Sequence, residues 1–313
     1  MRLMLSISDS RLRSDANRVL EMPAPHYQQR YPTLESRVAL RDAFAREGWV
    51  AADAPVEGIF PPVGPSGIAQ PFWSTPGSAE DSHHAYPGGL CVHEHFNGCM
   101  SDRFASNYDG IYFERHKEID RDLCVAAALY HDIMKSVVFQ YRGNGTFTPE
   151  LTIGGTGGHH VLSGAEAIAR GHDARFVTVL LSAHAAPSLG DEAKVVTWCR
   201  AAAMLAGVDP VAFGLVRKTA DGYALAEPPP IECFISHLSD HDYVLTVLAS
   251  QTVRPALARV ASHFGVSPSD APALNWWRLR ICANVSMIAL YEALLKGETA
   301  FARAVQAAHE LSS

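Results

Sequence analysis

A histidine and an aspartate stand side by side in the stretch Ala126-Ala127-Ala128-Leu129-Tyr130-His131-Asp132-Ile133-Met134-Lys135, inside an otherwise apolar run. The run predicts a helix over residues 122–135. Because neighbouring positions on a helix point about 100° apart, His131 and Asp132 cannot both face water, and burying an unpaired carboxylate is costly. A bound cation would remove that cost, and a hydrogen-bonded His–Asp pair without metal is the alternative. The three alanines would let a neighbouring helix approach closely.

Size and composition indicate a globular protein with a substantial core. The chain has 313 residues, 48% of them hydrophobic, and a formal net charge of -7. Without a basic block, this charge argues against a nucleic acid or a membrane surface as the main partner, so an anionic substrate must be attracted locally. The N-terminus does not resemble a signal peptide, and no apolar run is long enough to span a membrane. Six cysteines without a Cys-x-x-Cys pair indicate reduced thiols and a cytoplasmic protein.

Helical patterns cover most of the chain, so we expect an all-α fold. Helices are expected over residues 34–49, 122–135, 173–183, 192–207, 239–264, 273–296 and 298–311, with two more that begin after 89 and at 159. One small β-hairpin is expected over 136–153, because 137–141 favours a strand and Gly143-Asn144-Gly145 favours a turn. Prolines and glycines over 50–82 predict an ordered loop arm, and those over 154–158 a flexible turn.

Histidines recur along the chain near the predicted helix ends, about one helix and one loop apart. The motifs are Gly88-Gly89-Leu90-x-x-His93, His131-Asp132-x-x-Lys135, His160-x-x-x-Gly164-Ala165-Glu166 and His184. In this combination they resemble the HD superfamily of metal-dependent phosphohydrolases, over residues 88 to about 210. The resemblance implies an HD-type helical bundle with a small β-hairpin insertion. We expect an N-terminal arm over 1–87 that packs on the domain, a metal-binding helical core over 88–227, and a C-terminal helical extension of the same domain over 228–313.

The branches of this superfamily that bind two metals imply roles for the matched residues. His93 and His131 would hold one divalent ion, and Asp132 would bridge to the second. His160 and His184 would hold that second ion. Imidazole and carboxylate donors suit iron, manganese, nickel or similar ions, which lower the pKa of a bound water and neutralise a phosphoryl oxygen. Lys135, one turn after the doublet, would bind a phosphate or another anionic oxygen.

One position departs from the pattern of the superfamily. Its first metal site is closed by an aspartate on a later helix, and here Ala203 stands at the best local match. Asp209 is the nearest aspartate, but six residues correspond to about 600° of helix. Asp209 therefore reaches the site only if the helix ends near Gly207 and the following turn swings inward. A helix cap before Pro210 is the alternative, and both interpretations stay open.

Several other polar residues have two interpretations each. His84 and Tyr86 can line the mouth of the pocket or pack within a loop. His159 is interpreted as a neighbour that contacts substrate or supports the ligand His160, because the spacing to Gly164-Ala165-Glu166 favours His160, and a ligand role for His159 itself is the alternative. His95 is expected at the surface. The later cluster His237-Leu238-Ser239-Asp240-His241-Asp242 is interpreted as the start of a helix, with acidic residues that favour the helix dipole, and not as another metal site.

The leading hypothesis is a hydrolase of a small phosphoester, such as a nucleotide, a cyclic nucleotide or a sugar phosphate, with a metal-activated water at a dinuclear site. The same scaffold occurs in mixed-valent di-iron oxygenases such as myo-inositol oxygenase, which is the first alternative. A degenerate domain that serves as a signalling or scaffold partner is the second, motivated by Ala203. The arm and the C-terminal helices are candidates for shaping the pocket or a homo-oligomer interface.

Overall fold

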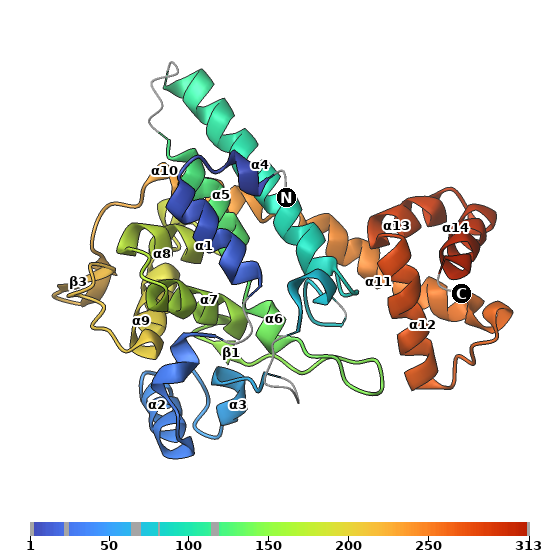
Figure 1. Ribbon diagram of the computed structural model, residues 1–313, viewed down its shortest axis with the longest axis horizontal. Helices are drawn as coiled ribbons and strands as arrows, with labels where there is room; N and C mark the ends of the chain where they lie inside the picture. The colour runs from blue at the N-terminus through green and yellow to red at the C-terminus, as the bar shows by residue number, and fades with distance from the viewer. Residues whose placement is uncertain (1–2, 22–24, 64–69, 81, 114–118, 312–313) are drawn as a thin grey trace. The chain divides into compact units, whose positions relative to one another are not determined.

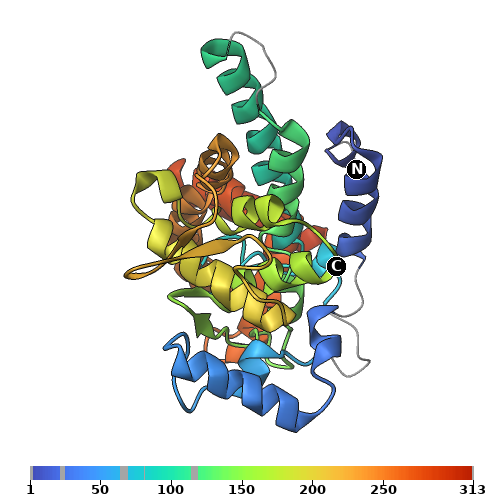
Figure 2. The same cartoon turned by 90° about the vertical axis from the view of Figure 1, so that its left-hand side faces the viewer.

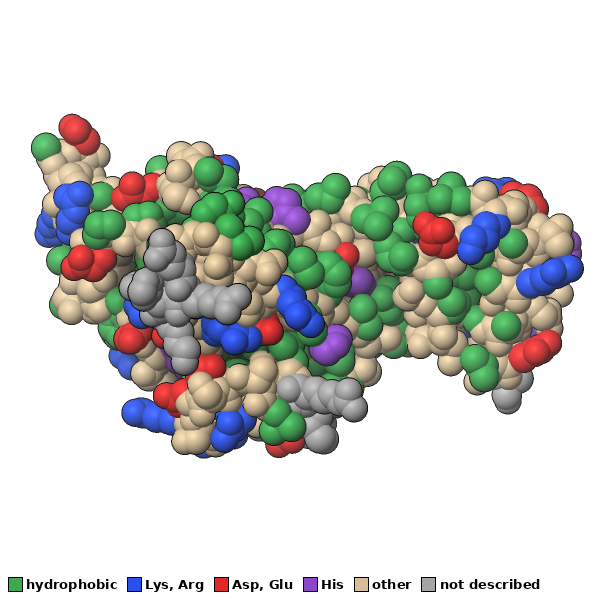
Figure 3. Space-filling view, turned by 90° about the horizontal axis from the view of Figure 1, so that it is seen from above, with side chains coloured by type: hydrophobic (Ala, Val, Ile, Leu, Met, Phe, Trp, Pro, Cys, Tyr) green, Lys and Arg blue, Asp and Glu red, His purple; other side chains and the backbone are tan. Residues whose placement is uncertain are grey.

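Helices dominate the computed structural model of the chain, which describes residues 3–21, 25–63, 70–80, 82–113 and 119–311 (Figure 1). Two small antiparallel strand pairs are the β-structure formed by these residues. The all-α fold class is therefore confirmed. Among the described helices, none is long and apolar enough to cross a membrane. On the face shown in Figure 3, acidic and basic side chains are interspersed among hydrophobic and polar ones.

Backbone contacts divide the chain into two compact units, and each unit collects segments that are distant in sequence. Unit 1 consists of Met1–Ala69, Glu94–Val138 and Glu150–His241, and unit 2 of Gln70–His93, Phe139–Pro149 and Asp242–Ser313. The boundaries expected after residues 87 and 227 do not coincide with those of the two units. The expected organisation into arm, core and extension stays a prediction.

Among its described residues, unit 1 contains the long helix α4 from Glu94 onward, nine further α-helices and both strand pairs. The helices are α1 (Ser10–Leu20), α2 (Leu34–Arg46), α3 (Val56–Ile59), α4 (Gly89–Tyr112), α5 (Arg121–Tyr130), α6 (Lys135–Val138), α7 (Gly158–Ala169), α8 (Ala174–Leu181), α9 (Glu192–Ala206) and α10 (Ile231–Ser239). The strands are β1 (Thr152–Ile153), β2 (Thr156–Gly157), β3 (Val216–Thr219) and β4 (Gly222–Leu225). Figures 1 and 2 both show α2 at the edge of this unit, beside α3.

Helices α5 and α7 form the centre of unit 1, because nearly every side chain on them is buried. Leu123 to Tyr130 are all buried on α5, and Gly158 to Ile168 on α7. Gly164 of α7 lets the neighbouring helices approach, since a Cβ there would lie 3.0 Å from Leu181 of α8 and 3.1 Å from Ala202 of α9. This close packing fixes the helix ends that carry the polar residues described below.

The helix expected over 122–135 ends earlier than the pattern suggested. Helix α5 stops at Tyr130, His131 is its C-cap, and α6 begins at Lys135. The backbone N–H groups of Ile133 and Lys135 bond three residues back, to Tyr130 and Asp132, at 3.3 and 2.8 Å. The i,i+4 backbone hydrogen bonds of an α-helix are thus interrupted at His131 and Asp132. The doublet lies on a turn and not inside a helix.

The expected hairpin over 136–153 is shorter than predicted, because α6 occupies its start. Its arms meet around the turn at Gly143–Gly145, where an antiparallel bridge joins Tyr141 and Phe147. Backbone N–H groups of Arg142 and Thr148 donate across this turn to the carbonyls of Thr146 and Gln140 at 2.8 and 3.0 Å. The segment expected as a flexible turn is instead the tip of the β1–β2 hairpin, where Gly154 and Gly155 have positive φ angles of 58° and 81°. The β3–β4 pair was not expected at all.

Helix α1 was missed because only two of its side chains are buried, Ala16 and Val19. Polar contacts hold it instead. Asp15 accepts from Nη1 of Arg170 at 3.2 Å and lies 2.9 Å from Nε2 of His172, and it also bonds the hydroxyl of Tyr130. Burial alone would raise the pKa of Asp15, but these partners hold it well below its usual range.

Unit 2 contains α11 (Tyr243–Val260), α12 (Ala271–Asn284), α13 (Met287–Leu295) and α14 (Glu298–Glu310). Its core includes Trp277, Leu290 and Phe301. The single helix expected over 273–296 is split, because Val285 is extended and Ser286 caps α13 by accepting from Ala289 N at 3.2 Å.

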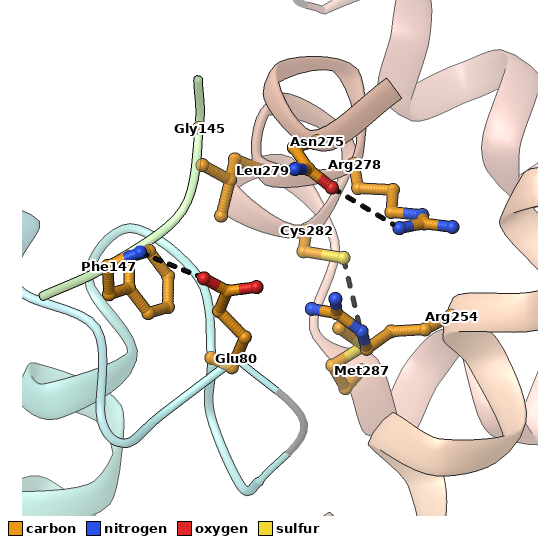
Figure 4. Close-up of a pocket in the computed structure, with 10 residues that line it drawn as sticks. Glu80, Gly145, Phe147, Arg254, Asn275, Arg278, Leu279, Cys282 and Met287 are labelled. Atoms are coloured by element: carbon orange, nitrogen blue, oxygen red, sulfur yellow. Dashed lines mark hydrogen bonds between the residues drawn. The ribbon is translucent and has the colours of Figure 1, made fainter. Parts of the chain in front are cut away.

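A small pocket of unit 2 lies among polar side chains near Cys282 (Figure 4). Glu80 points toward Phe147 and accepts its backbone N–H at 3.0 Å, and Arg254 and Arg278 reach toward the same space. The cavity measures about 10 Å³, which is room for one water molecule. This pocket is therefore too small for a substrate.

We expect Asp15→Asn to lower the free energy of unfolding by about 1 to 3 kcal/mol at pH 7, because it weakens charge-assisted hydrogen bonds. The folded-state pKa of Asp15 lies below its unfolded value of 3.8, so this stabilisation is present above that pH and is lost as the pH falls below it. Urea denaturation at a series of pH values would show the wild type and the variant converging in acid. The exposed Asp53→Asn is the control and should behave as wild type throughout.

Gly164→Val should lower the free energy of unfolding by about 1 to 3 kcal/mol, since the added carbons have no space between α7, α8 and α9. Gly110→Ala on α4 is the matched control. A Cβ at Gly110 meets nothing within 4 Å, so the substitution should raise stability by up to about 1 kcal/mol through helix propensity. Equal effects of the two substitutions in denaturant titrations would contradict the packing described for α7.

Candidate metal centre

Side chains from the ends of four helices converge in unit 1. His131 and Asp132 follow α5, His159 lies in the first turn of α7, His184 follows α8, and Asp240 is the C-cap of α10. Within the described part of unit 1, they form two overlapping groups whose donor atoms lie within 4.8 Å of one another. One group is His131, His184 and Asp240, and the other is Asp132, His159 and His184.

The ring of His131 faces acceptors on both sides. Its Nδ1 lies 2.6 Å from the carbonyl of Ala128, which can only accept, so Nδ1 carries a proton. Its Nε2 lies 3.4 Å from Oδ2 of Asp132 and 3.3 Å from Oδ1 of Asp240. Burial alone would lower the pKa of His131, but Asp132, Glu94 and Asp240 outweigh it and raise that pKa well above the usual range. Nε2 must hold either a second proton or a cation.

Asp132 is fully buried and lies against three basic groups. It forms an ion pair with Lys135, itself only 2% exposed, and its Oδ1 lies 2.9 Å from Nε2 of His159. Burial would raise the pKa of Asp132, but His131, Lys135 and His159 hold it well below its usual value. The carboxylate is therefore ionised. Lys135 was expected to bind a phosphate or another anionic oxygen, and in the structure it pairs with this carboxylate.

His159, and not His160, lies against Asp132. The ring Nδ1 and the backbone N–H of His159 both contact Glu150, the latter at 2.9 Å, and this turns the ring toward Asp132. Burial would lower the pKa of His159, but Glu150 and Asp132 raise it to about 9. Because adjacent helical residues point about 100° apart, only one of the two histidines can face the carboxylate.

His160 instead supports His184 from behind. Its ring stacks on that of His184, with centroids 4.0 Å apart, and its Nε2 donates to the carbonyl of Leu181 at 2.9 Å. Burial and the neighbouring His184 hold the pKa of His160 well below its usual value. Among the described residues, its buried Nδ1 has no hydrogen-bond partner. The spacing to residues 164–166 favoured His160, whereas His159 is the ring that lies against Asp132.

His184 is the most accessible member of the groups, with 23% of its side chain exposed. Its Nδ1 lies 3.2 Å from the hydroxyl of Thr156, and its Nε2 lies 3.8 Å from Asp132 and 3.6 Å from Asp240. Burial lowers the pKa of His184 to about 4, so the ring is neutral near pH 7. If Thr156 accepts from Nδ1, a lone pair on Nε2 faces two carboxylates.

Asp240 was missed by the sequence analysis, and Asp209 does not join either group. Asp209 is exposed, and its Oδ1 accepts from the backbone N–H groups of Val211 and Ala212 at 2.9 and 2.7 Å, which matches the capping interpretation. Asp240 follows α10 and is not at a helix start, because α11 begins only at Tyr243. The available signal was the cluster over 237–242, in which this aspartate directly follows an apolar helix.

His93, His84 and Tyr86 belong to unit 2. His93 lies beside His83 and His84, with ring centroids 4.6 and 5.5 Å away, and one nitrogen of each lies within 4.8 Å of the others. His84 Nδ1 is 3.0 Å from the Tyr86 hydroxyl, and its Nε2 is 2.7 Å from Asp242. The expectation that His84 and Tyr86 contact substrate stays a prediction, as does a ligand role for His93. His95 is exposed, as expected.

The donor set of unit 1 fits divalent cations. Ligand atoms that share an ion at 2.0–2.2 Å lie about 3.0 to 3.5 Å apart, close to the separations between Asp240 and the two histidines, 3.3 and 3.6 Å. Helices α5, α8 and α10 all end at this cluster, and helix C-termini carry partial negative charge that favours a cation.

Comparison with known families agrees with this geometry. The family model of the HD domain matches residues 99–241. The match begins after His93, includes every member of the two donor groups, and ends one residue after Asp240. No curated protein and no solved structure matches the chain. The resemblance noted in the sequence is confirmed by this match to the HD domain, which covers residues 99–241 of the chain.

Proposed function

We propose that the chain is a metal-dependent hydrolase of a small phosphoester, and that it activates a water at a dinuclear site. HD domains are in general metal-dependent phosphohydrolases, which makes hydrolysis the first choice. The observation that carries the proposal is the pair of donor groups that share His184 around the buried carboxylates of Asp132 and Asp240. Two overlapping groups of this kind suit two neighbouring ions better than one.

We assign the donors to two ions. His131 and Asp240 would hold one, Asp132 and His159 the other, and His184 lies within reach of both groups. This assignment replaces Asp209 by Asp240 and His160 by His159 relative to the ligand set expected from the sequence. Bound ions of this type lower the pKa of a coordinated water and neutralise a phosphoryl oxygen.

The surrounding residues prepare the donors for this task. Lys135 keeps the carboxylate of Asp132 ionised, so that both oxygens can accept. Glu150 orients His159 through the ring and the backbone N–H. The partial exposure of His184 indicates the side from which water and substrate reach the donors. Because the remaining donors are buried, the reacting group must be small, such as the phosphate of a nucleotide, a cyclic nucleotide or a sugar phosphate.

A mixed-valent di-iron oxygenase is the second candidate. Three imidazoles and two carboxylates form the two donor groups, and this combination suits iron as well as manganese or nickel. The two candidates differ in what they consume, since only the oxygenase requires dioxygen. Measuring the metal content of the protein is the first experiment for both candidates.

We expect protein purified without added metal to contain two metal ions per chain by elemental analysis. His184→Ala should reduce this content to about one or less, because that ring belongs to both donor groups, and His131→Ala should also reduce it. His95→Ala, which changes an exposed histidine, is the matched control and should keep both ions. Wild-type protein without metal would contradict the proposal and support a scaffold role.

The loaded protein would then be assayed with nucleoside monophosphates, cyclic nucleotides and sugar phosphates for phosphate release. Oxygen uptake would be recorded in parallel in a closed cell. Phosphate release that is unchanged without oxygen supports the hydrolase. Substrate loss that requires oxygen and yields no phosphate would overturn it in favour of the oxygenase.

We expect Lys135→Gln to lower the free energy of unfolding of the metal-free protein by about 3 to 5 kcal/mol, because it leaves Asp132 without its buried cation. Phosphate release by the loaded variant should fall by about 100-fold. Lys194→Gln is the control, since Lys194 forms an ion pair of the same i,i+3 spacing with Asp191 at an exposed site, worth less than about 1 kcal/mol. Equal losses of unfolding free energy for the two variants would contradict the proposed stabilisation of the buried Asp132 carboxylate by Lys135.

A further inference from the structure

Helix α4 carries three buried polar side chains on one face within unit 1. Glu94, Asn97 and Ser101 follow the i, i+3, i+7 spacing of a single helical stripe, and each is at most 1% exposed. Apolar residues would fill such a stripe at lower cost, because a buried polar group needs a partner. The partners of all three lie at or next to the candidate metal donors.

Glu94 approaches the far side of the His131 ring. Its Oε2 lies 3.5 Å from Nδ1 of His131, the same atom that donates to the carbonyl of Ala128 at 2.6 Å. A carbonyl and a carboxylate on this side both favour the proton at Nδ1. When the ring is neutral, its lone pair is therefore on Nε2, which faces Asp132 and Asp240.

Asn97 holds the carboxylate of Asp240. Its Nδ2 donates to Oδ1 of Asp240 at 3.1 Å, and this oxygen is the one that lies 3.3 Å from Nε2 of His131. An amide N–H cannot accept a hydrogen bond, so it favours the ionised carboxylate and fixes the rotation about its last torsion.

Ser101 holds the helix end that carries Asp240. One turn beyond Asn97, its hydroxyl donates to Oγ of Ser239 at 2.8 Å, and Ser239 donates to the carbonyl of Ser236 at 2.9 Å. Ser239 directly precedes Asp240. The stripe therefore contacts two consecutive residues at the end of α10.

We propose that Glu94, Asn97 and Ser101 act together as positioning residues that fix the tautomer of His131 and the orientation of Asp240, and thereby set the affinity for metal. This inference rests on the proposed metal site. None of the three provides a donor atom in either group. Their loss would weaken binding without removing a ligand, as happens when residues that orient metal ligands are changed.

The test is a titration of metal-stripped protein with Mn²⁺, followed by the electron paramagnetic resonance signal of the free ion. Asn97→Ala should raise the dissociation constant for Mn²⁺ by about 10- to 100-fold. Asn107→Ala is the matched control, because Asn107 lies on the exposed side of the same helix, and it should leave the constant unchanged.

Ser101→Ala provides a milder second variant if Asn97→Ala does not fold, and it should weaken Mn²⁺ binding by a smaller factor in the same direction. Both variants would be titrated well below their melting temperatures. A lower melting temperature with an unchanged Mn²⁺ constant would mean that the stripe is merely structural and would overturn the inference. Wild-type protein that binds no Mn²⁺, or binds it equally well after His131→Ala, would instead overturn the proposed metal site itself.

Discussion

The buried carboxylate of Asp132 is the constraint on which unit 1 depends. An ionised group without access to water is stable only if the protein surrounds it with compensating charge. Lys135 and His159 contact it directly, and His131 faces one of its oxygens across 3.4 Å. The two histidines have support of their own, since Glu150 contacts Nδ1 of His159 and the carbonyl of Ala128 accepts from Nδ1 of His131. Asp132 is thus surrounded by basic groups, and the histidines among them contact further polar groups. Buried apolar side chains of α5 and α7 pack around this cluster.

Helix ends are what allow so many polar side chains to converge. In the middle of a helix, residues that share a face are separated by a full turn, and the backbone offers no spare hydrogen-bonding groups. At an end, the chain can turn and free carbonyls are available, as for Ala128 and Leu181, which accept from His131 and His160. The same arrangement leaves His184 at the rim, where the interior meets solvent.

The sequence predicted the elements whose signals are local, and it failed where the deciding contacts are distant. The His131-Asp132 doublet, the predominance of helices and the HD resemblance were all visible. Helix α1 was not, because Asp15 and its partners on α5 and beyond α7 hold it in place of an apolar stripe. The choice between His159 and His160 depends on Glu150, and the closing aspartate depends on where α10 ends. Neither the position of Glu150 nor the end of α10 produces a periodic pattern in the sequence.

The β1–β2 hairpin has a consequence for how this chain can vary. Its tip is held by Gly154, whose N–H donates to the carbonyl of Trp49 at 2.8 Å and whose carbonyl accepts from the Trp198 indole at 2.9 Å. Its base is held by the bond from Gly158 N–H to the carbonyl of Leu151 at 2.8 Å, immediately before His159. Surface loops usually tolerate insertions during evolution. Here an inserted residue would shift the start of α7 and His159 together. The length of this hairpin should therefore be as strongly conserved among related proteins as the histidine itself.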